Sequence, residues 1–147
     1  TAIHQRLARF ERHAESAAVV FVDVNQLKYI NDSFGHAAGD FALLQIATRL
    51  DESIRATDVA ARIGGDEFGL ILDQSTEEGA RVQVNRLRHV LSAEPAIYDG
   101  HVIQLSACFG VAMLEAGATE SEILAAADRD MYRSKQSQDA DSPVRHR

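Results

Sequence analysis

Arg62-Ile63-Gly64-Gly65-Asp66-Glu67-Phe68 is the stretch on which the interpretation of this 147-residue chain depends. Apolar runs lie on both sides of it, at residues 59–63 and 68–72. Paired glycines between two strand-like runs predict a tight hairpin, because glycine reaches positive φ without steric cost. Two acidic residues follow the glycines, so we expect Asp66 and Glu67 at the mouth of the hairpin. Carboxylates in that place can meet a ligand or a metal ion.

A second acidic turn lies upstream, within residues 21–40. The apolar run at 17–22 that leads into it is continuous, as expected for a strand buried on both faces. The run ends at Asp23, so this carboxylate should emerge at the carboxyl end of the strand. If the strand lies beside the hairpin, Asp23 and Asp66 converge, and Mg²⁺ is usually held by one or two carboxylates plus substrate phosphates. The pattern alone leaves a metal site and a solvated turn equally open.

Composition indicates one globular domain, with 46% hydrophobic and 25% charged residues in a chain long enough for a core. The formal net charge of −7 repels a nucleic-acid backbone, so we expect no nucleic-acid polymer as a partner. The single cysteine, Cys108, excludes a disulfide framework and favours a reducing cytoplasm. Since no apolar run approaches the roughly 20 residues that span a bilayer, we expect no direct membrane contact from this chain.

The order of predicted elements implies an α/β fold. Periodicity and capping residues predict helices at 1–16, 41–53, 76–91 and 120–135, strands at 17–22, 59–63, 68–72, 96–98 and 101–113, and a turn at 25–31. Asp99-Gly100 predicts a second tight hairpin between the last two strands. Strands with interposed helices and hairpins predict a mixed, mostly antiparallel sheet flanked by helices.

Together, the two acidic turns resemble the two signature blocks of the GGDEF domain, the diguanylate cyclase family. The resemblance covers residues 17–135 and implies a five-stranded sheet flanked by helices, similar to nucleotide cyclases and polymerase palms. We therefore expect a single GGDEF domain over 1–135 and a polar tail over 136–147. The family's Leu-Thr-Gly-containing stretch is missing before the first predicted helix, so we expect the amino-terminal edge to be truncated.

The resemblance implies a metal centre and a catalytic pair. Asp23, the backbone carbonyl of Val24 and Asp66 match the family's metal ligands, with Mg²⁺ as the expected ion and Mn²⁺ as the alternative. Asp66 and Glu67 match the catalytic acids, and the division of roles between them stays open. Repulsion between carboxylates as close as those of Asp66 and Glu67 raises the pKa of one of them. A bound metal ion removes this repulsion.

Five further residues match positions that contact the GTP substrate in the family. Asn31 and Asp40 match the residues that hydrogen-bond guanine, and both could instead stabilise their own turns. Lys28 and Lys135 match phosphate-contacting lysines, and His36 either shapes its turn or touches the ligand.

Arg55 and Asp58 match the family's Arg-x-x-Asp inhibitory site, where these enzymes bind their own product, cyclic di-GMP. Arginine can fork onto phosphate and stack on guanine, and aspartate can accept from the guanine edge. The alternative is an ordinary surface pair, because Arg-x-x-Asp alone is a common pattern.

The resemblance implies a diguanylate cyclase that condenses two GTP into cyclic di-GMP and two pyrophosphates, with product inhibition. It implies a homodimer in which each domain holds one GTP, attached to sensory or other regulatory domains. A cytoplasmic location follows, with membrane anchoring of a longer protein left open.

Two alternatives remain. An inactive GGDEF module that binds GTP or cyclic di-GMP would regulate an attached domain; Asp139, where the family has a basic residue, favours it, and the intact Asp66-Glu67 pair opposes it. A cyclase that makes a cyclic mononucleotide is disfavoured by Asn31 and Asp40.

Overall fold

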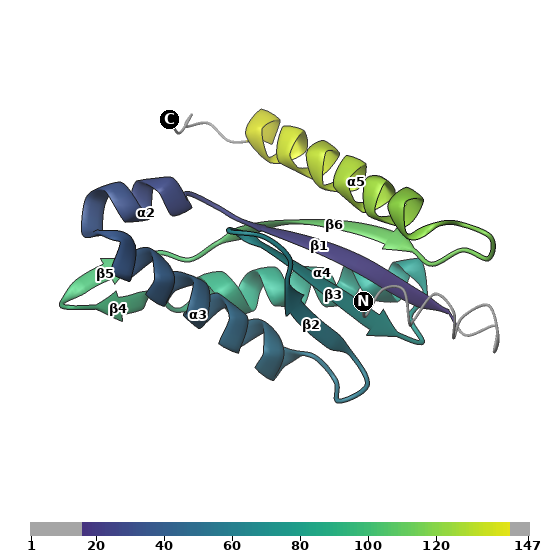
Figure 1. The fold of residues 1–147 in the computed structure, drawn as a ribbon, viewed down its shortest axis with the longest axis horizontal. Helices are drawn as coiled ribbons and strands as arrows, with labels where there is room; N and C mark the ends of the chain where they lie inside the picture. The colour runs from purple at the N-terminus through teal and green to yellow at the C-terminus, as the bar shows by residue number, and fades with distance from the viewer. Residues whose placement is uncertain (1–15, 142–147) are drawn as a thin grey trace.

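The computed structural model describes residues 16–141, and side chains up to residue 135, so the predicted helix over 1–16 lies outside the described residues apart from its last position. The elements follow in the order β1 (Ala17–Val24), α2 (Leu27–Phe34), α3 (His36–Ser53), β2 (Val59–Arg62), β3 (Glu67–Asp73), α4 (Glu77–Ala93), β4 (Ala96–Tyr98), β5 (His101–Ile103), β6 (Ala107–Met113) and α5 (Glu120–Asp141) (Figure 1).

The predicted α/β class with an antiparallel sheet is confirmed, with the strands divided four and two. β2, β3, β1 and β6 form one sheet in that order, and all their pairings are antiparallel. β4 and β5 form a separate ribbon, because the predicted strand over 101–113 is interrupted at residues 104–106. β1 is therefore a central strand, which explains why its sequence is apolar on both faces.

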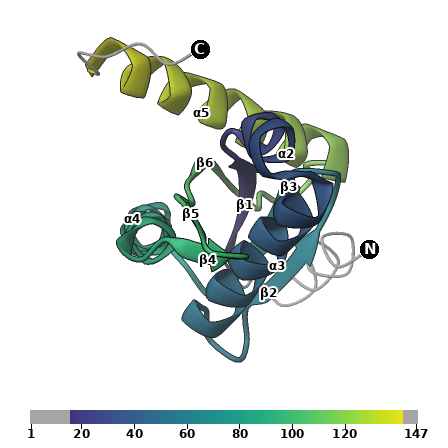
Figure 2. The same ribbon diagram turned by 90° about the vertical axis from the view of Figure 1, so that its left-hand side faces the viewer.

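The helices cover both faces of this sheet (Figure 2). Alternate residues of β1, beginning with Ala18 and Val20, belong to the larger core cluster, together with buried residues of α3 and α4. Ala17 and Val19 belong to a smaller cluster with Ile123 and Ala127 of α5. The sheet is thus the middle layer, and only its ends and edges are open to ligands.

The segment between β1 and α3 differs from the predicted turn. Residues 27–34 form the helix α2, which Gln26 enters in the left-handed region (φ 61°). Gly35 (φ 96°) then separates α2 from α3, which begins at His36, five residues before the predicted start. Gln26 is a poor helix-start signal, so periodicity could not find α2 in a stretch of eight residues.

The capping predictions at α4 and α5 agree with the structure. Thr76 Oγ1 accepts from the N–H of Gly79 at 3.0 Å at the start of α4. Thr119 and Glu122 exchange bonds of 3.1 and 2.8 Å in a capping box before α5. α5 runs to Asp141, so the backbone of the first part of the predicted tail is helical. Among residues 16–141, no helix has the length and apolarity required to cross a bilayer.

Candidate functional site

The two acidic turns meet at one end of the sheet. β1 pairs with β3 so that Asp23 lies opposite Glu67, and the N–H of Val24 donates to the carbonyl of Asp66 at 2.9 Å. The condition set by the sequence, that these two strands are neighbours, is therefore met. Asp23 and Asp66 are half-buried and Glu67 is exposed, so we call this group of three carboxylates the acidic corner.

The Gly-Gly turn has a different basis from the one predicted. Positive φ was expected at Gly64 and Gly65, but in the described part of the chain the glycines with positive φ are Gly35, Gly100 and Gly117. Residues 63–66 form a four-residue loop, closed by a 2.9 Å bond from the N–H of Ile63 to the carbonyl of Glu67. Loops of this length are built around ordinary right-handed turns, so the expectation of positive φ was wrong.

Arg62 braces the loop in a way that sequence reasoning missed. Its Nε donates to the carbonyl of Gly64 at 3.0 Å, and a terminal nitrogen donates to that of Gly65 at 2.6 Å. A Cβ on Gly65 would meet open space among the described residues. Since neither φ nor packing requires glycine at 65, the bare backbone is free for close approach by a ligand.

Lys135 of α5 lies at the acidic corner. Its Nζ donates to Asp23 Oδ2 at 2.8 Å, with the two side chains 40% and 21% exposed. The hydrogen bond to Asp23 raises the pKa of Lys135; burial opposes this, and the negative charges of Asp23 and Asp66 add to it. A cation is thus favoured between α5 and the two strands. Lys135 joins four other predicted site residues here, namely Asp23, Val24, Asp66 and Glu67.

Asn25 and Cys108 form the side of the corner toward β6. Cys108 pairs with Asp23 across β1 and β6, and its Sγ lies 3.3 Å from Asn25 Oδ1. Asn25 is tied to Ser106 by a 3.0 Å side-chain bond and a 2.9 Å backbone bond. Cys108 is 5% exposed, and burial raises the pKa of its thiol.

The predicted guanine contacts lie on α2 and α3. The Asn31 side chain packs so closely on Gly39 that a Cβ there would stand 1.8 Å from Asn31 Oδ1. Asp40 follows Gly39 and lines a groove of about 680 Å³ between α3 and β2, with Leu43 and Phe68 among its other walls. Asn31 and Asp40 are thus brought close together by the Gly39 contact.

His36 and Lys28 are both exposed. His36 is the first residue of α3, close in sequence to the guanine contacts. The Lys28 Nζ pairs with Asp32 Oδ2 at 2.9 Å, and its side chain is 90% exposed. The hydrogen bond to Asp32 raises the pKa of Lys28.

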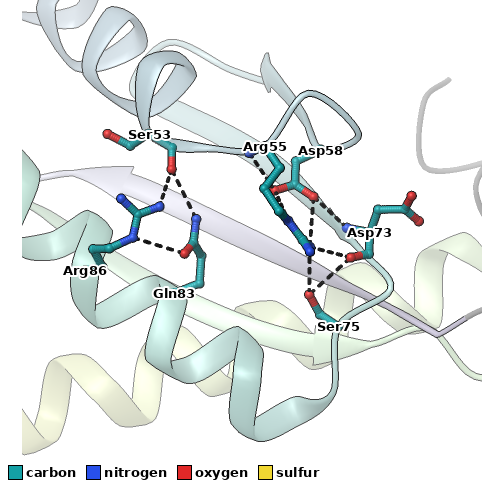
Figure 3. A network of polar contacts seen from close by, with 7 residues as sticks. All are labelled: Ser53, Arg55, Asp58, Asp73, Ser75, Gln83 and Arg86. Atoms are coloured by element: carbon teal, nitrogen blue, oxygen red, sulfur yellow. Dashed lines mark hydrogen bonds and ion pairs between the residues drawn. The ribbon is translucent and has the colours of Figure 1, made fainter.

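Arg55 and Asp58 precede β2, at the end of this strand opposite the hairpin loop. They form a network of polar contacts there (Figure 3). The buried Asp58 carboxylate accepts from the N–H of Asp73 at 2.8 Å and from the N–H of Arg55 at 3.0 Å. The Arg55 guanidinium donates to Asp58 at 3.3 Å, to the carbonyl of Asp73 and to Ser75 Oγ at 3.4 Å. These bonds tie the loop before β2 to the end of β3.

Two side chains of α4 extend this network to the end of α3. Gln83 donates to the carbonyl of Ser53 at 3.2 Å, and Arg86 donates to the same carbonyl (Figure 3). Arg86 also donates to Gln83 at 3.2 Å. Arg55, Asp58 and Arg86 therefore have structural partners, while the Arg55 side chain stays 57% exposed.

The donor set at the acidic corner fits a hard divalent cation. Over the described residues, no three or more His, Cys, Asp or Glu side chains are grouped as a complete metal site. Magnesium does not require such a group, because it keeps waters and takes substrate phosphates beside one or two carboxylates. Asp23 and Asp66 supply those carboxylates, and the Lys135 ammonium shows that positive charge is accommodated there.

Fold and site together define an α/β domain whose antiparallel sheet carries an acidic corner beside a glycine loop at one end. The model of the family described as "Diguanylate cyclase, GGDEF domain" matches residues 1–141. This chain belongs to the GGDEF diguanylate cyclase family.

Known relatives agree with this assignment. The chain is 36% identical over 126 residues to the probable diguanylate cyclase DgcE of Escherichia coli, covering 85% of this chain and 11% of DgcE. The solved GGDEF domain of TpbB from Pseudomonas aeruginosa is 33% identical with a TM-score of 0.84, covering 92% of this chain and 85% of that one. A microbial GGDEF domain studied with bis-(3,5)-cyclic di-GMP is 30% identical with a TM-score of 0.78, covering 92% and 83%. The chain thus spans a small part of DgcE.

Proposed function

We propose that this chain is the catalytic domain of a diguanylate cyclase, which condenses two GTP into cyclic di-GMP with release of two pyrophosphates. The observation that carries the proposal is the bond from Val24 to Asp66 beside the Asp23–Glu67 pairing. It holds three carboxylates at one open sheet end, where a divalent cation bound by them would balance the charge on reacting phosphates.

The residues at the corner have separate tasks in this proposal. Asp23, the Val24 carbonyl and Asp66 hold Mg²⁺, or Mn²⁺ in its place, which supplies charge stabilisation for the triphosphate. Lys135 contacts phosphate from the α5 side, and its short bond to Asp23 supports this position. Lys28 and His36, exposed residues of α2 and α3, contact the substrate after side-chain rearrangement.

The base is bound at the junction of α2 and α3. A carboxylate at Asp40 accepts from guanine N1–H and N2–H₂, and the Asn31 amide donates to O6 or N7. The groove beside Asp40 supports this assignment, because its apolar walls at Leu43 and Phe68 suit the faces of a purine.

Catalysis in this proposal requires two copies of the domain facing each other. The 3′-oxygen of one GTP forms a bond to the α-phosphorus of the other, the bond to pyrophosphate breaks, and the hydroxyl proton passes to Asp66 or Glu67. The exposed Glu67 supports this role, since it can reach a substrate on the partner. We further propose a cytoplasmic location and attachment to sensory or other regulatory domains.

Product inhibition is proposed at Arg55 and Asp58, with Arg86 as a neighbour. The half-exposed Arg55 guanidinium can turn from Asp73 and Ser75 toward a phosphate of cyclic di-GMP, while Asp58 keeps its bond to Asp73. The related microbial domain studied with cyclic di-GMP supports a binding role in this family.

The test is incubation of the chain with GTP and Mg²⁺, followed by chromatography of the products. We expect cyclic di-GMP from the parent chain and at least about a hundredfold less from Glu67→Gln, as for loss of a proton acceptor. Glu78→Gln, an exposed acid in the first turn of α4, is the matched control and should retain activity. GTP binding without any product from the parent would favour the inactive module over the cyclase.

A further inference from the structure

An ion pair between α4 and α5, which the predicted site does not include, lies beside the edge strand β6. Asp130 of α5 is 6% exposed and accepts a 2.8 Å bond from the N–H of Val111. Arg81 of α4 forks onto the same carboxylate, with bonds of 3.1 and 3.0 Å. Arg133 adds a weaker contact at 3.4 Å.

This carboxylate joins three elements around an open edge. β6 is the last strand of the four-stranded sheet, so the N–H of Val111 faces away from β1 and needs an outside partner. α4 and α5 lie on either side of β6 (Figure 2), and Arg81 reaches around the edge to Asp130. We call the Arg81–Asp130–Val111 group the edge clamp.

A second contact determines how far α5 slides along β6. A Cβ on Gly110 would stand 2.1 Å from the carbonyl oxygen of Ala127 and 2.6 Å from Met131 N and Cβ. The helix therefore rests directly on the strand at this point, and it can do so only because residue 110 lacks a side chain.

The register set at Gly110 leads directly to the acidic corner. Lys135 follows Met131 by one turn, a rise of about 6 Å. Cys108 precedes Gly110 by two residues on the same face of β6, about 6.7 Å along the strand. Cys108 lies opposite Asp23, which is where the Lys135 ammonium is found.

From this geometry we infer that Arg81 and Asp130 are positioning residues for Lys135: the edge clamp fixes α5 so that the Lys135 ammonium stands at the acidic corner. One consequence is that the edge clamp sets the affinity for the triphosphate of GTP, and this consequence rests on the proposed function. The structural part of the inference, the position of Lys135, can be tested without any nucleotide. Neither Arg81 nor Asp130 touches the substrate; both act through Lys135.

The chain offers an internal reference for a direct test, because Lys28 and Lys135 are its only lysines. The 147-residue chain is treated briefly with acetic anhydride, and acetylation of each lysine is measured by peptide mass spectrometry. We expect Arg81→Gln and Asp130→Asn to raise the ratio of Lys135 to Lys28 acetylation at least threefold, because Lys135 leaves Asp23. Arg129→Gln, which removes a charge from the same helix outside the edge clamp, should leave the ratio unchanged.

Folding is checked by thermal unfolding, and Arg81→Gln is the safer variant because Asp130 keeps its bond to Val111. An unchanged acetylation ratio in a folded Arg81→Gln chain would overturn the inference.

Affinity for a non-hydrolysable GTP analogue with Mg²⁺ tests the consequence by calorimetry. We expect Arg81→Gln to weaken binding about fivefold in the parent chain and less than twofold in the Lys135→Gln background. An equal loss in both backgrounds would show a general structural effect and overturn the role through Lys135. If the parent binds no analogue, the proposed function fails, while the acetylation ratio still decides the position of Lys135.

Discussion

Gly39 of α3 should be dispensable for folding but required for guanine binding. A Cβ on Gly39 would lie 1.8 Å from Oδ1 and 2.8 Å from Cγ of Asn31. To restore an ordinary contact, the Asn31 amide must move by about 1.5 Å in Gly39→Ala. The neighbour that gives way is the end of a flexible side chain, so the backbone of α2 and α3 can stay in place.

The two effects of Gly39→Ala have different magnitudes. In a helix interior the change from glycine to alanine gains about 1 kcal/mol, and an off-rotamer Asn31 costs about 0.5–1.5 kcal/mol. We therefore expect the free energy of unfolding to change by less than about 1 kcal/mol. Loss of the amide contact to guanine should cost about 1–3 kcal/mol of binding, or roughly 5- to 150-fold in Kd.

Urea unfolding and calorimetric titration with non-hydrolysable GTP and ATP analogues measure both quantities. Preference for GTP should fall in Gly39→Ala by about the same factor as in Asn31→Ala. The double variant should bind no more weakly than Asn31→Ala alone, because the amide is already gone. Full additivity of the two losses, or unchanged binding in Gly39→Ala, would refute the assignment of Asn31 to the base.

Three further changes test other parts of the structure. Gly65→Ala should leave the free energy of unfolding unchanged or raise it by up to about 1 kcal/mol. GTP binding should weaken at least about fivefold, and unchanged binding would exclude close approach of the ligand to the backbone at residue 65. Arg55→Ala should relieve inhibition by added cyclic di-GMP, and an unchanged inhibition constant would disprove the inhibitory site. It should also lower the free energy of unfolding in urea by about 1 kcal/mol, because the buried Asp58 loses a hydrogen-bond partner. Burial alone would raise the pKa of Asp130, but bonds from Arg81 and Val111 outweigh it and lower the pKa below 3.8. The stability advantage of the parent over Asp130→Asn should therefore be full above about pH 4 and disappear as the pH falls through the folded pKa, as followed by urea unfolding; a pH-independent difference would contradict it.

Elements with a strong local signal could be predicted from the sequence. The apolar run of β1 predicted a doubly covered strand. A capping residue at Ser75 or Thr76 predicted the start of α4, and the structure shows Thr76 in that role. Asp99 and Gly100 both have positive φ, as the Asp-Gly hairpin prediction requires. In each case the residues that determine the structure lie within a few positions of one another.

Features that depend on distant residues could not be predicted in this way. The bond from Asp58 to Asp73 joins residues 15 positions apart, and that from Arg81 to Asp130 joins residues 49 apart. In the sequence, each of these charged residues resembles an ordinary solvated surface residue. The family resemblance identified Asp58 as a ligand contact, whereas the structure adds a buried backbone bond to it.

Some substitutions at this site should affect activity without affecting stability, and others should affect both. The position of each residue relative to the packed layers of the sheet determines which. Asp66 and Glu67 lie beyond the covered part of β3 and outside both core clusters, so their amide variants should lose activity without unfolding. Lys135 lies at the same corner but comes from α5, whose position depends on Gly110 and Asp130 within the packed layers. A substitution at Gly110 or Asp130 therefore affects the acidic corner through α5. Comparing its effect on GTP binding in the parent and in the Lys135→Gln background separates this route from a general loss of stability.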